Sequence, residues 1–485
     1  MGYSRAISGD AGRARALVRY GPIVLGVLAA IGILASAIDI STSHAGMLLV
    51  VIGCAPLVLW ALTPSRTSLP LPELSGLFYA ATFGLPAVVQ VDNFVRGGEA
   101  AVTIATRYAL LGISCFVAGS LAARPRIGRM GRLVCLERDH RLPNGIYRLS
   151  LIALALAIMY DISGMPVISL NNLVETLKMF SLVVLFFGLF SRQLGHLEWF
   201  VFAFALIPIE VVLRLFSGMV GQFAIFAVIA ALMAERTGRR LQYVLALIAV
   251  LAIVGLNDIK ADYRKEFWYA GASTTGNILE KIDWARERLG DGLFDLATGS
   301  SKNSMLTRID HLGTLSAVVE MTPSFIPYYY GQTYEELAYS WIPRVLWPDK
   351  PLANLGNRWA KDYGLLHEGD QVTSFNLPWL VELYMNFGVV GVGAGMALFG
   401  LAFQIASNRF GTRRTGTMAF LIAASVSLQL WYAESNFALM VGAIPSQILF
   451  LYVLVRVLFP SAFRPPQQLM HDTGHTGARP PFIAH

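Results

Sequence analysis

Charged residues and cysteines are both scarce in this chain of 485 residues. Only 14% of the residues are charged, whereas 55% are hydrophobic and the mean hydropathy is +0.56. Soluble domains carry about 25% charged residues, so the composition excludes that class and predicts an integral membrane protein. Cysteine occurs only as Cys54, Cys115 and Cys135. None of them lies between residues 257 and 384, so no disulfide framework is predicted in that segment.

Motifs of nucleotide, metal and hydrolytic chemistry are also missing. The sequence contains neither a GxxxxGK(S/T) phosphate loop nor a GxSxG nucleophile elbow. His311 and His367 have no Cys or His partner at the spacing of zinc ligands. We therefore expect no metal site, no other cofactor and no ATP-driven transport within this chain.

Apolar stretches of roughly 16 to 22 residues recur along the sequence, close to the ~20 residues with which a helix crosses a bilayer. They predict an all-α polytopic membrane protein with about 12 transmembrane helices. The expected helices are 22–38, 45–62, 74–91, 104–121, 147–160, 174–190, 198–214, 218–234, 241–256, 385–406, 416–432 and 438–459. The chain then divides into nine helices (1–256), a large loop (257–384), three helices (385–459) and a tail (460–485).

The distribution of basic residues predicts the orientation. Arginines gather in the N-terminal segment, in the segment 122–147 and in the tail, whereas the turns 39–44, 161–172 and 433–437 contain no Lys or Arg. The positive-inside rule therefore places both termini in the cytoplasm and the large loop outside it. The net charge of +7 follows from this topology, and we do not expect a nucleic-acid partner.

The large loop is far longer than an ordinary connection, and long loops of this kind usually carry function. Apolar residues at helical spacing between Ile278 and Leu296 predict an amphipathic helix, either on the membrane surface or packed within the loop. A second helical pattern runs from Met305 to Glu320. A third helix is expected to begin at Thr333, which has capping-box spacing to Glu336.

Cations and indoles are densest between residues 341 and 361, where three prolines stiffen the backbone. Arg344, Lys350 and Arg358 match the oxygens of a diphosphate. The tryptophans offer flat apolar faces on which sugar rings can stack. The alternative is a membrane-interface belt whose cations bind lipid headgroups. The three candidate stacking residues are Trp341, Trp347 and Trp359.

Other ionisable residues lie near the predicted membrane ends of helices. Glu210 and Arg214 are four residues apart, so they share a helix face and are either a structural ion pair or functional. Arg264 is placed to meet a lipid phosphate unless it belongs to a solvated turn. Apolar neighbours of Glu382 can raise its pKa toward that of a general base, although a capping role is equally consistent. Glu434 is a weaker candidate of the same kind.

Several segments resemble the bacterial O-antigen polymerase family, the Wzy-type oligosaccharide repeat-unit polymerases. The resemblance covers the overall architecture and, locally, about residues 305–390. It rests on Arg308, Ile309 and Asp310, on Gly331, Gln332, Thr333 and Tyr334, on Ile342–Pro351, and on Glu382–Gly388. It implies a glycosyltransferase of the GT-C type in the bacterial inner membrane, with the large loop in the periplasm. Membrane lipids, a chain-length regulator and a flippase are the other expected partners.

By this resemblance the donor is an oligosaccharide on undecaprenyl diphosphate and the acceptor is a second lipid-linked repeat unit. Such a metal-independent polymerase would serve O-antigen or exopolysaccharide synthesis. A departing diphosphate can be stabilised by preplaced cations. The expected diphosphate-binding residues are Arg264, Arg308, Arg344, Lys350 and Arg358. Arg344 is the strongest of them, and Glu382 or His311 would accept the proton of the acceptor hydroxyl.

Three other functions fit parts of the sequence. An O-antigen-ligase-like enzyme shares the expected fold but transfers a finished glycan. A transporter of lipid-linked oligosaccharides would also have many helices, although transporter sites usually lie at the membrane midplane. A structural scaffold would not depend on any single loop cation. Some polymerases of the group use arginines in two outer loops, whereas this chain has a single large loop, so the role of a second site stays open.

Overall fold

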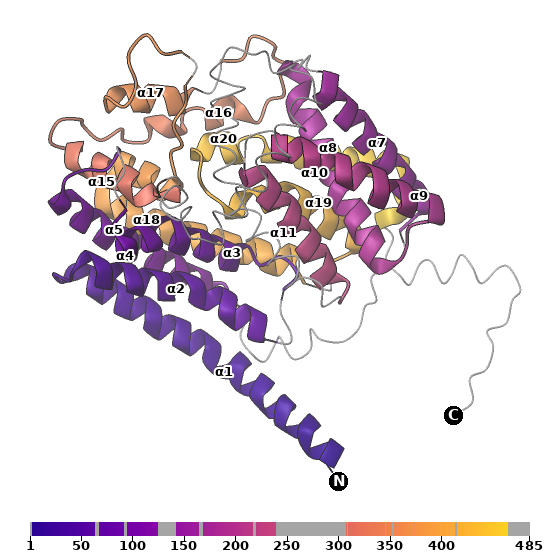
Figure 1. Ribbon diagram of the computed structural model, residues 1–485, viewed down its shortest axis with the longest axis horizontal. Helices are drawn as coiled ribbons and strands as arrows, with labels where there is room; N and C mark the ends of the chain where they lie inside the picture. Colours follow the sequence, from indigo (N-terminus) through magenta and orange to yellow (C-terminus); the bar gives the residue numbers. More distant parts are fainter. Residues whose placement is uncertain are drawn as a thin grey trace, which may run out of the picture.

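The computed structural model describes residues 2–63, 67–91, 95–124, 142–163, 168–216, 220–238, 307, 309–344, 346–351, 354–371, 373–412 and 415–463. Figure 1 shows this part of the chain as a bundle of helices, with α15, α16 and α17 gathered at one end of α5 and α18. The described residues form helices, turns and loops and contain no strand. The prediction of an all-α protein is confirmed for them.

Eight helical stretches among the described residues are long and apolar enough to cross a membrane. The chain is therefore a helical membrane protein, and about two thirds of the predicted number of spans is found. The eight are Arg19–Ala37 in α1 (Gly2–Ala37), α2 (Thr42–Leu62), α5 (Glu99–Ala122), α7 (Asn144–Ser163), Leu170–Ser191 in α8 (Ile168–Ser191), His196–Arg214, α18 (Trp379–Phe410) and Phe437–Leu458.

Two of these stretches consist of several consecutive elements. His196–Arg214 comprises α9 (His196–Val201), the π-helix η2 (Phe202–Leu206) and most of α10 (Ile207–Phe216). Phe437–Leu458 comprises α20 (Phe437–Val441) and α21 (Ile444–Leu458), which is followed by the short η6 (Pro460–Phe463).

The other predicted spans have different outcomes. The stretch 74–91 is helical but divided into α3 (Leu71–Tyr79), the π-helix η1 (Ala80–Gly84) and α4 (Leu85–Val89). The stretch 218–234 corresponds to α11 (Val220–Arg236), and 416–432 corresponds to α19 (Thr417–Ser427) with η5 (Leu428–Trp431). The last two stretches are shorter than a full span. The stretch 241–256 lies outside the described residues.

Glycines allow the central helices to approach closely. A Cβ at Gly119 of α5 would lie 1.9 Å from the Ala397 carbonyl oxygen, and one at Gly400 of α18 would lie 1.9 Å from the Phe116 carbonyl oxygen. Small residues at helix crossings are typical of membrane proteins, where backbone packing replaces the hydrophobic effect between helices. This contact fixes α18, which carries the site described below, against α5.

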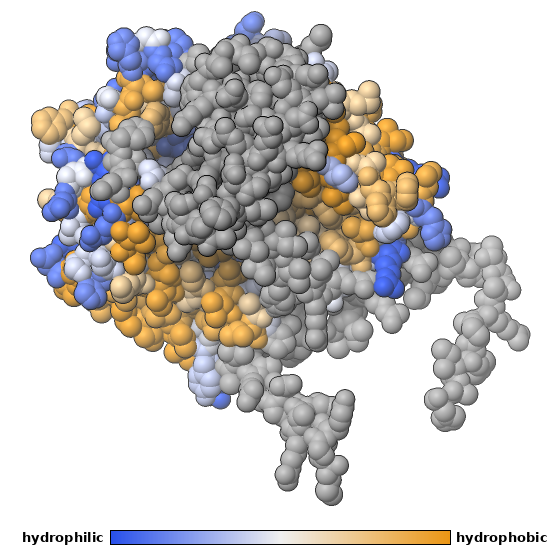
Figure 2. Space-filling view, in the orientation of Figure 1, coloured by the Kyte–Doolittle hydropathy of each residue, from blue (hydrophilic) through white to orange (hydrophobic). Residues whose placement is uncertain are grey.

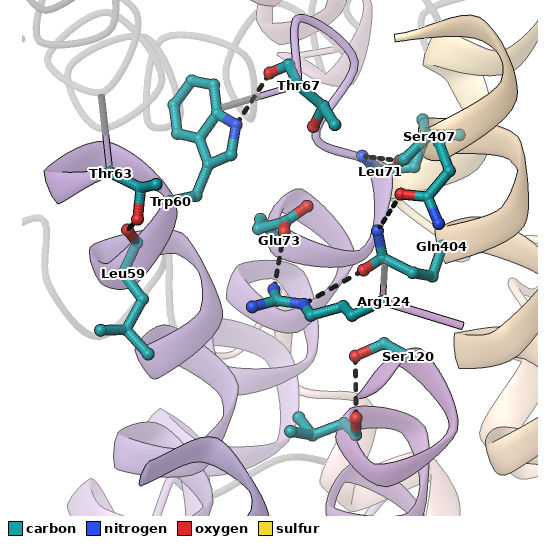
Figure 3. A network of polar contacts seen from close by, with 12 residues as sticks. Leu59, Trp60, Thr63, Thr67, Leu71, Glu73, Ser120, Arg124, Gln404 and Ser407 are labelled. Atoms are coloured by element: carbon teal, nitrogen blue, oxygen red, sulfur yellow. Dashed lines mark hydrogen bonds and ion pairs between the residues drawn. The ribbon is translucent and has the colours of Figure 1, made fainter. Parts of the chain in front are cut away.

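Hydrogen bonds join segments that the charge pattern assigns to the same side. On the predicted outer side, the Gly97 amide donates to the Ser316 hydroxyl at 3.1 Å. At the opposite end, Figure 3 shows Arg124 between Glu73 and Gln404, with distances of 3.0 and 3.3 Å. The described contacts therefore agree with the predicted alternation of the chain. Which end faces the periplasm stays a prediction.

The exposed surface is apolar over the transmembrane helices. Figure 2 shows hydrophobic side chains over α2 and over α7 and α9, and hydrophilic ones above α17. Leu34, Leu156 and Leu197 are 71%, 60% and 72% exposed. Large leucines with this exposure are suited to contact lipid tails, in which every backbone polar group must be satisfied within the helix.

Candidate functional site

The outer part of α18 ends in a break. Gly388 has φ 62° and ψ −153°, a conformation available essentially only to glycine, and it separates the first turns of α18 from the rest. The freed carbonyl oxygens of Met385 and Asn386 accept hydrogen bonds from the amides of Tyr329 and Tyr330, at 3.0 and 3.2 Å. The break therefore attaches the large loop directly to α18.

Glu382 lies at the centre of a buried hydrogen-bond network. Its Oε1 accepts from the Thr333 hydroxyl and its Oε2 from the Phe437 amide, both at 2.7 Å. The Asn386 amide donates to the Thr333 hydroxyl and its oxygen accepts from the Gly331 amide, both at 2.8 Å. Glu382 is 0% exposed, so both carboxylate oxygens are occupied within the protein.

This network brings together two segments that the sequence analysis singled out separately. Gly331–Tyr334 and Glu382–Gly388 are far apart in the chain, but Thr333, Gly331, Glu382 and Asn386 are hydrogen-bonded to one another. The predicted capping box at Thr333 is wrong, because its hydroxyl donates to Glu382 and Thr333 lies in the short 3-10 helix η4 (Gln332–Tyr334). A separate turn, α16 (Leu337–Ser340), follows it.

Arg344 and Lys350 hold the proline-rich loop together. The guanidinium of Arg344 donates to the carbonyl oxygens of Lys350 and Pro351, at 2.5 and 2.9 Å. The Lys350 ammonium donates to the carbonyl oxygens of Ser340 and Ile342, at 3.1 and 2.8 Å. Burial, with a smaller contribution from Arg344, lowers the pKa of Lys350 below its ordinary value. In this conformation both cations serve the backbone of their own loop.

Arg358 is the exposed cation of the group. It lies on α17 (Leu355–Asp362), and within the described part of the chain its guanidinium makes no hydrogen bond. Its charge acts on Glu336, whose pKa is raised above the ordinary value by burial and lowered in part by Arg358. Arg358 therefore presents free donors beside a buried carboxyl, the arrangement in which a bidentate phosphate contact is available.

The three candidate indoles have different environments. Trp341 and Trp347 are 51% and 40% exposed, so each offers a ring face to a ligand or to a membrane surface. Trp359 is only 1% exposed and packs against the rings of Tyr363 and Phe375. In this conformation the ring of Trp359 is therefore part of the core of the loop and offers no face to a sugar, so its predicted stacking role is untested.

His311 lies in a separate apolar environment. It is the first residue of α15 (His311–Met321), which Asp310 caps by accepting from the Gly313 amide at 2.8 Å. The imidazole is 6% exposed, and the rings of Phe78 and Phe83 have centroids 5.9 and 6.0 Å away. Burial lowers the pKa of His311 to about 4.

The predicted residues Arg264 and Arg308 lie outside the described residues, as does the helix 278–296.

Glu210 and Arg214 form the ion pair that their spacing predicts, and the pair belongs to a larger buried cluster. Arg214 Nε and Nη2 lie 2.7 and 2.6 Å from Glu210 Oε1. Lys178 of α8 contacts the same oxygen at 3.3 Å and also pairs with Asp161 of α7. Glu210, Arg214 and Lys178 are 0%, 4% and 6% exposed. The cluster joins α7, α8 and α10.

Glu434 has a simpler environment, since it accepts from the Asn376 side-chain amide at 2.5 Å and ties the turn before α20 to the loop. Across the described residues, no group of three His, Cys, Asp or Glu side chains has the arrangement of a metal site.

Two residues of interest were not predicted as site residues from the sequence, Glu336 and Lys178. The available signal for the buried cluster was a single lysine, Lys178, within the apolar stretch 174–190.

These observations define the class: an all-helical membrane protein whose large loop is hydrogen-bonded to a broken helix at one end of the bundle. Residues 74–463 match the model of a protein family described as a domain of unknown function (DUF8712). The match spans most of the chain, so the protein belongs to this family. Comparison with curated proteins and with solved structures returned no match.

Proposed function

We propose that this protein is a lipid-carrier-dependent glycosyltransferase of GT-C-like fold, a polysaccharide repeat-unit polymerase of the bacterial inner membrane. In this proposal it transfers a glycan from undecaprenyl diphosphate to a lipid-linked acceptor repeat unit at the periplasmic face. The main support is the hydrogen-bonded junction of Thr333, Asn386 and Glu382. It unites two of the segments on which the resemblance rests, Gly331–Tyr334 and Glu382–Gly388.

In the proposed reaction, one bond to the anomeric carbon forms and one bond to that carbon breaks. The acceptor hydroxyl oxygen bonds to the anomeric carbon of the donor glycan, and the bond from that carbon to the diphosphate oxygen breaks. The diphosphate leaves with the electron pair, so negative charge develops on its oxygens. A guanidinium placed beside those oxygens stabilises the transition state more than the ground state.

The structure suggests different tasks for the predicted cations. We assign the diphosphate contact among the described cations to Arg358, because Arg344 and Lys350 donate to carbonyl oxygens of their own loop. Arg344 and Lys350 then fix the loop that carries Trp341 and Trp347, which we assign to the sugar. Arg264 and Arg308 stay proposed contacts outside the described residues.

Deletion of the gene tests the function, because three activities leave different intermediates. A polymerase predicts that single repeat units accumulate on undecaprenyl diphosphate at the periplasmic face. A ligase-like enzyme predicts long lipid-linked polymer, and a transporter predicts repeat units that a periplasmic glycosidase cannot reach. Unchanged lipid-linked glycans would contradict all three activities.

Arg358→Ala tests the site within this function, with Lys361→Ala on the same helix as the matched control. We expect Arg358→Ala to abolish polymer in the complemented deletion strain, and Lys361→Ala to restore it. Protein levels in the membrane, measured by immunoblot, should be equal. Polymer of normal length and yield from Arg358→Ala would refute the assignment of the diphosphate contact.

A further inference from the structure

Glu336 is a buried carboxyl that no interaction fully satisfies. It stands between η4 and α16 and is 8% exposed. Its Oε2 is buried and has no hydrogen-bond partner among the described residues, whereas both oxygens of Glu382 accept hydrogen bonds. An unpaired buried carboxylate oxygen costs the native state free energy. Such an atom in a native protein is a candidate for a functional role.

The charged neighbours of Glu336 come from three elements. The charge of Arg358 on α17 acts on Glu336, and Glu336 in turn acts on Glu382 of α18. Tyr339 and Glu335 lie on its own segment, where Tyr339 also senses the charge of Arg344. The helix α20, which packs against α16, contributes Phe437–Val441 and thus no ionisable side chain. Among the described residues, Arg358 is therefore the cation whose charge acts on the Glu336 carboxyl.

This environment suits a proton acceptor. Burial raises the pKa of Glu336 from its ordinary value, so the carboxylate is a stronger base than an exposed glutamate. Arg358 limits that rise. It also brings a diphosphate-binding group next to the base, which a glycosyl transfer between two bound substrates requires.

We propose that Glu336 accepts the proton of the acceptor hydroxyl in the glycosyl transfer, while Glu382 is a positioning residue that fixes the Thr333 turn. The proposal rests on the proposed function. The proton leaves the hydroxyl as its oxygen bonds to the anomeric carbon, and it ends on the Glu336 carboxylate. The diphosphate departs with the electron pair of the broken bond. His311 is a weaker candidate, because burial lowers its pKa to about 4 and makes its imidazole a weaker base than an ordinary histidine.

The test compares wild-type protein with Glu336→Gln and with the matched control Glu335→Gln, which changes the neighbouring exposed carboxyl. Purified proteins in lipid nanodiscs receive radiolabelled repeat units on undecaprenyl diphosphate, extracted from the deletion strain. The rate of ladder formation is measured between pH 5 and 9. General-base catalysis contributes about 10²- to 10⁴-fold, so Glu336→Gln should lose a factor in that range. Glu335→Gln should keep the wild-type rate.

The pH profile separates catalysis from folding. The wild-type rate should fall toward low pH as Glu336 is protonated, and the residual rate of Glu336→Gln should lose this acid limb. A wild-type rate from Glu336→Gln, or an unchanged acid limb in its residual activity, would overturn the role of Glu336 alone. Absence of a ladder with wild-type protein would overturn the polymerase activity itself, and with it this proposal. Equal unfolding temperatures of the variants confirm that the fold is intact.

Discussion

Replacement of Thr333 by valine should measurably destabilise the loop junction. Valine keeps the shape of threonine but removes the hydroxyl that donates to Glu382 and accepts from Asn386. Thr333 is 0% exposed, so water cannot replace either partner. A buried group that loses its partner costs about 1–3 kcal/mol. The Glu382 oxygen loses the hydroxyl, whereas the Asn386 amide keeps its hydrogen bond to the Glu382 carbonyl oxygen, so we expect a loss of about 1–3 kcal/mol.

The matched control is Thr333→Ser, which keeps the hydroxyl and should cost only about 0.8 kcal/mol for the lost methyl group. The assay is thermal unfolding of the purified protein in detergent at one scan rate, followed by tryptophan fluorescence. A double-mutant cycle with Glu382→Gln should give a coupling energy of about 0.5–3 kcal/mol. Equal unfolding temperatures for the valine and serine variants would refute the reasoning.

Three further predictions use the same unfolding assay. Gly388 has φ 62°, and a Cβ in Gly388→Ala would lie 2.9 Å from the Tyr328 hydroxyl oxygen. This variant should therefore lower the free energy of unfolding by about 1–3 kcal/mol. An unchanged unfolding temperature would contradict the break at Gly388. Lys178→Met should lower the free energy of unfolding by about 3–5 kcal/mol, because it removes one member of a buried ion pair. Arg148→Met removes one member of an exposed pair and should lower it by less than about 1 kcal/mol. Equal shifts in unfolding temperature would contradict a buried cluster. Between pH 6.5 and about pH 4, His311 is protonated in the unfolded chain but not in the native state. The free energy of unfolding should therefore fall with decreasing pH more steeply in wild type than in His311→Phe. Equal dependence on pH in the two proteins would contradict this role of burial.

Hydropathy identified the long helices, because the length of an apolar run is a property of composition. It could not identify the division of the stretch 74–91 into three elements. A carbon at the Cβ position of either Gly53 or Gly76 would lie 2.6 or 2.5 Å from the other residue's carbonyl oxygen. This close contact between α2 and α3, and the π-helix η1 beyond it, depend on which helices are neighbours. A single sequence does not contain that information.

The site illustrates a second limit. Glu382 and Thr333 could each be recognised, but their hydrogen bond depends on the break at Gly388 that brings the loop against α18. Arg344 was expected to bind phosphate because a guanidinium fits such oxygens. Pro343, Pro348 and Pro351 prevent regular structure in this loop, so its carbonyl oxygens need other donors, and Arg344 and Lys350 supply them.

The location of the charges also bears on the choice between a transferase and a transporter. Ionisable groups within membrane-spanning helices often mark transport pathways, and Lys178, Glu210 and Arg214 are such groups. Lys178 and Arg214 both contact Glu210, however. A transport cycle that separates either cation from Glu210 would therefore cost a free energy of about 3–5 kcal/mol for each buried pair broken. A cluster that joins α7, α8 and α10 in this way is better suited to hold the helices together.

Arg358 has the opposite properties, since it is exposed and forms no ion pair with a carboxylate of the described residues. A transferase therefore predicts that Lys178→Met lowers the amount of folded protein, whereas Arg358→Ala leaves the fold intact and stops glycan transfer. A transporter with its path through the buried cluster predicts the reverse: Lys178→Met folds but does not move substrate, and Arg358→Ala is active. Measuring folded protein and product together for these two variants separates the two functions, because each predicts a different variant to be inactive while folded.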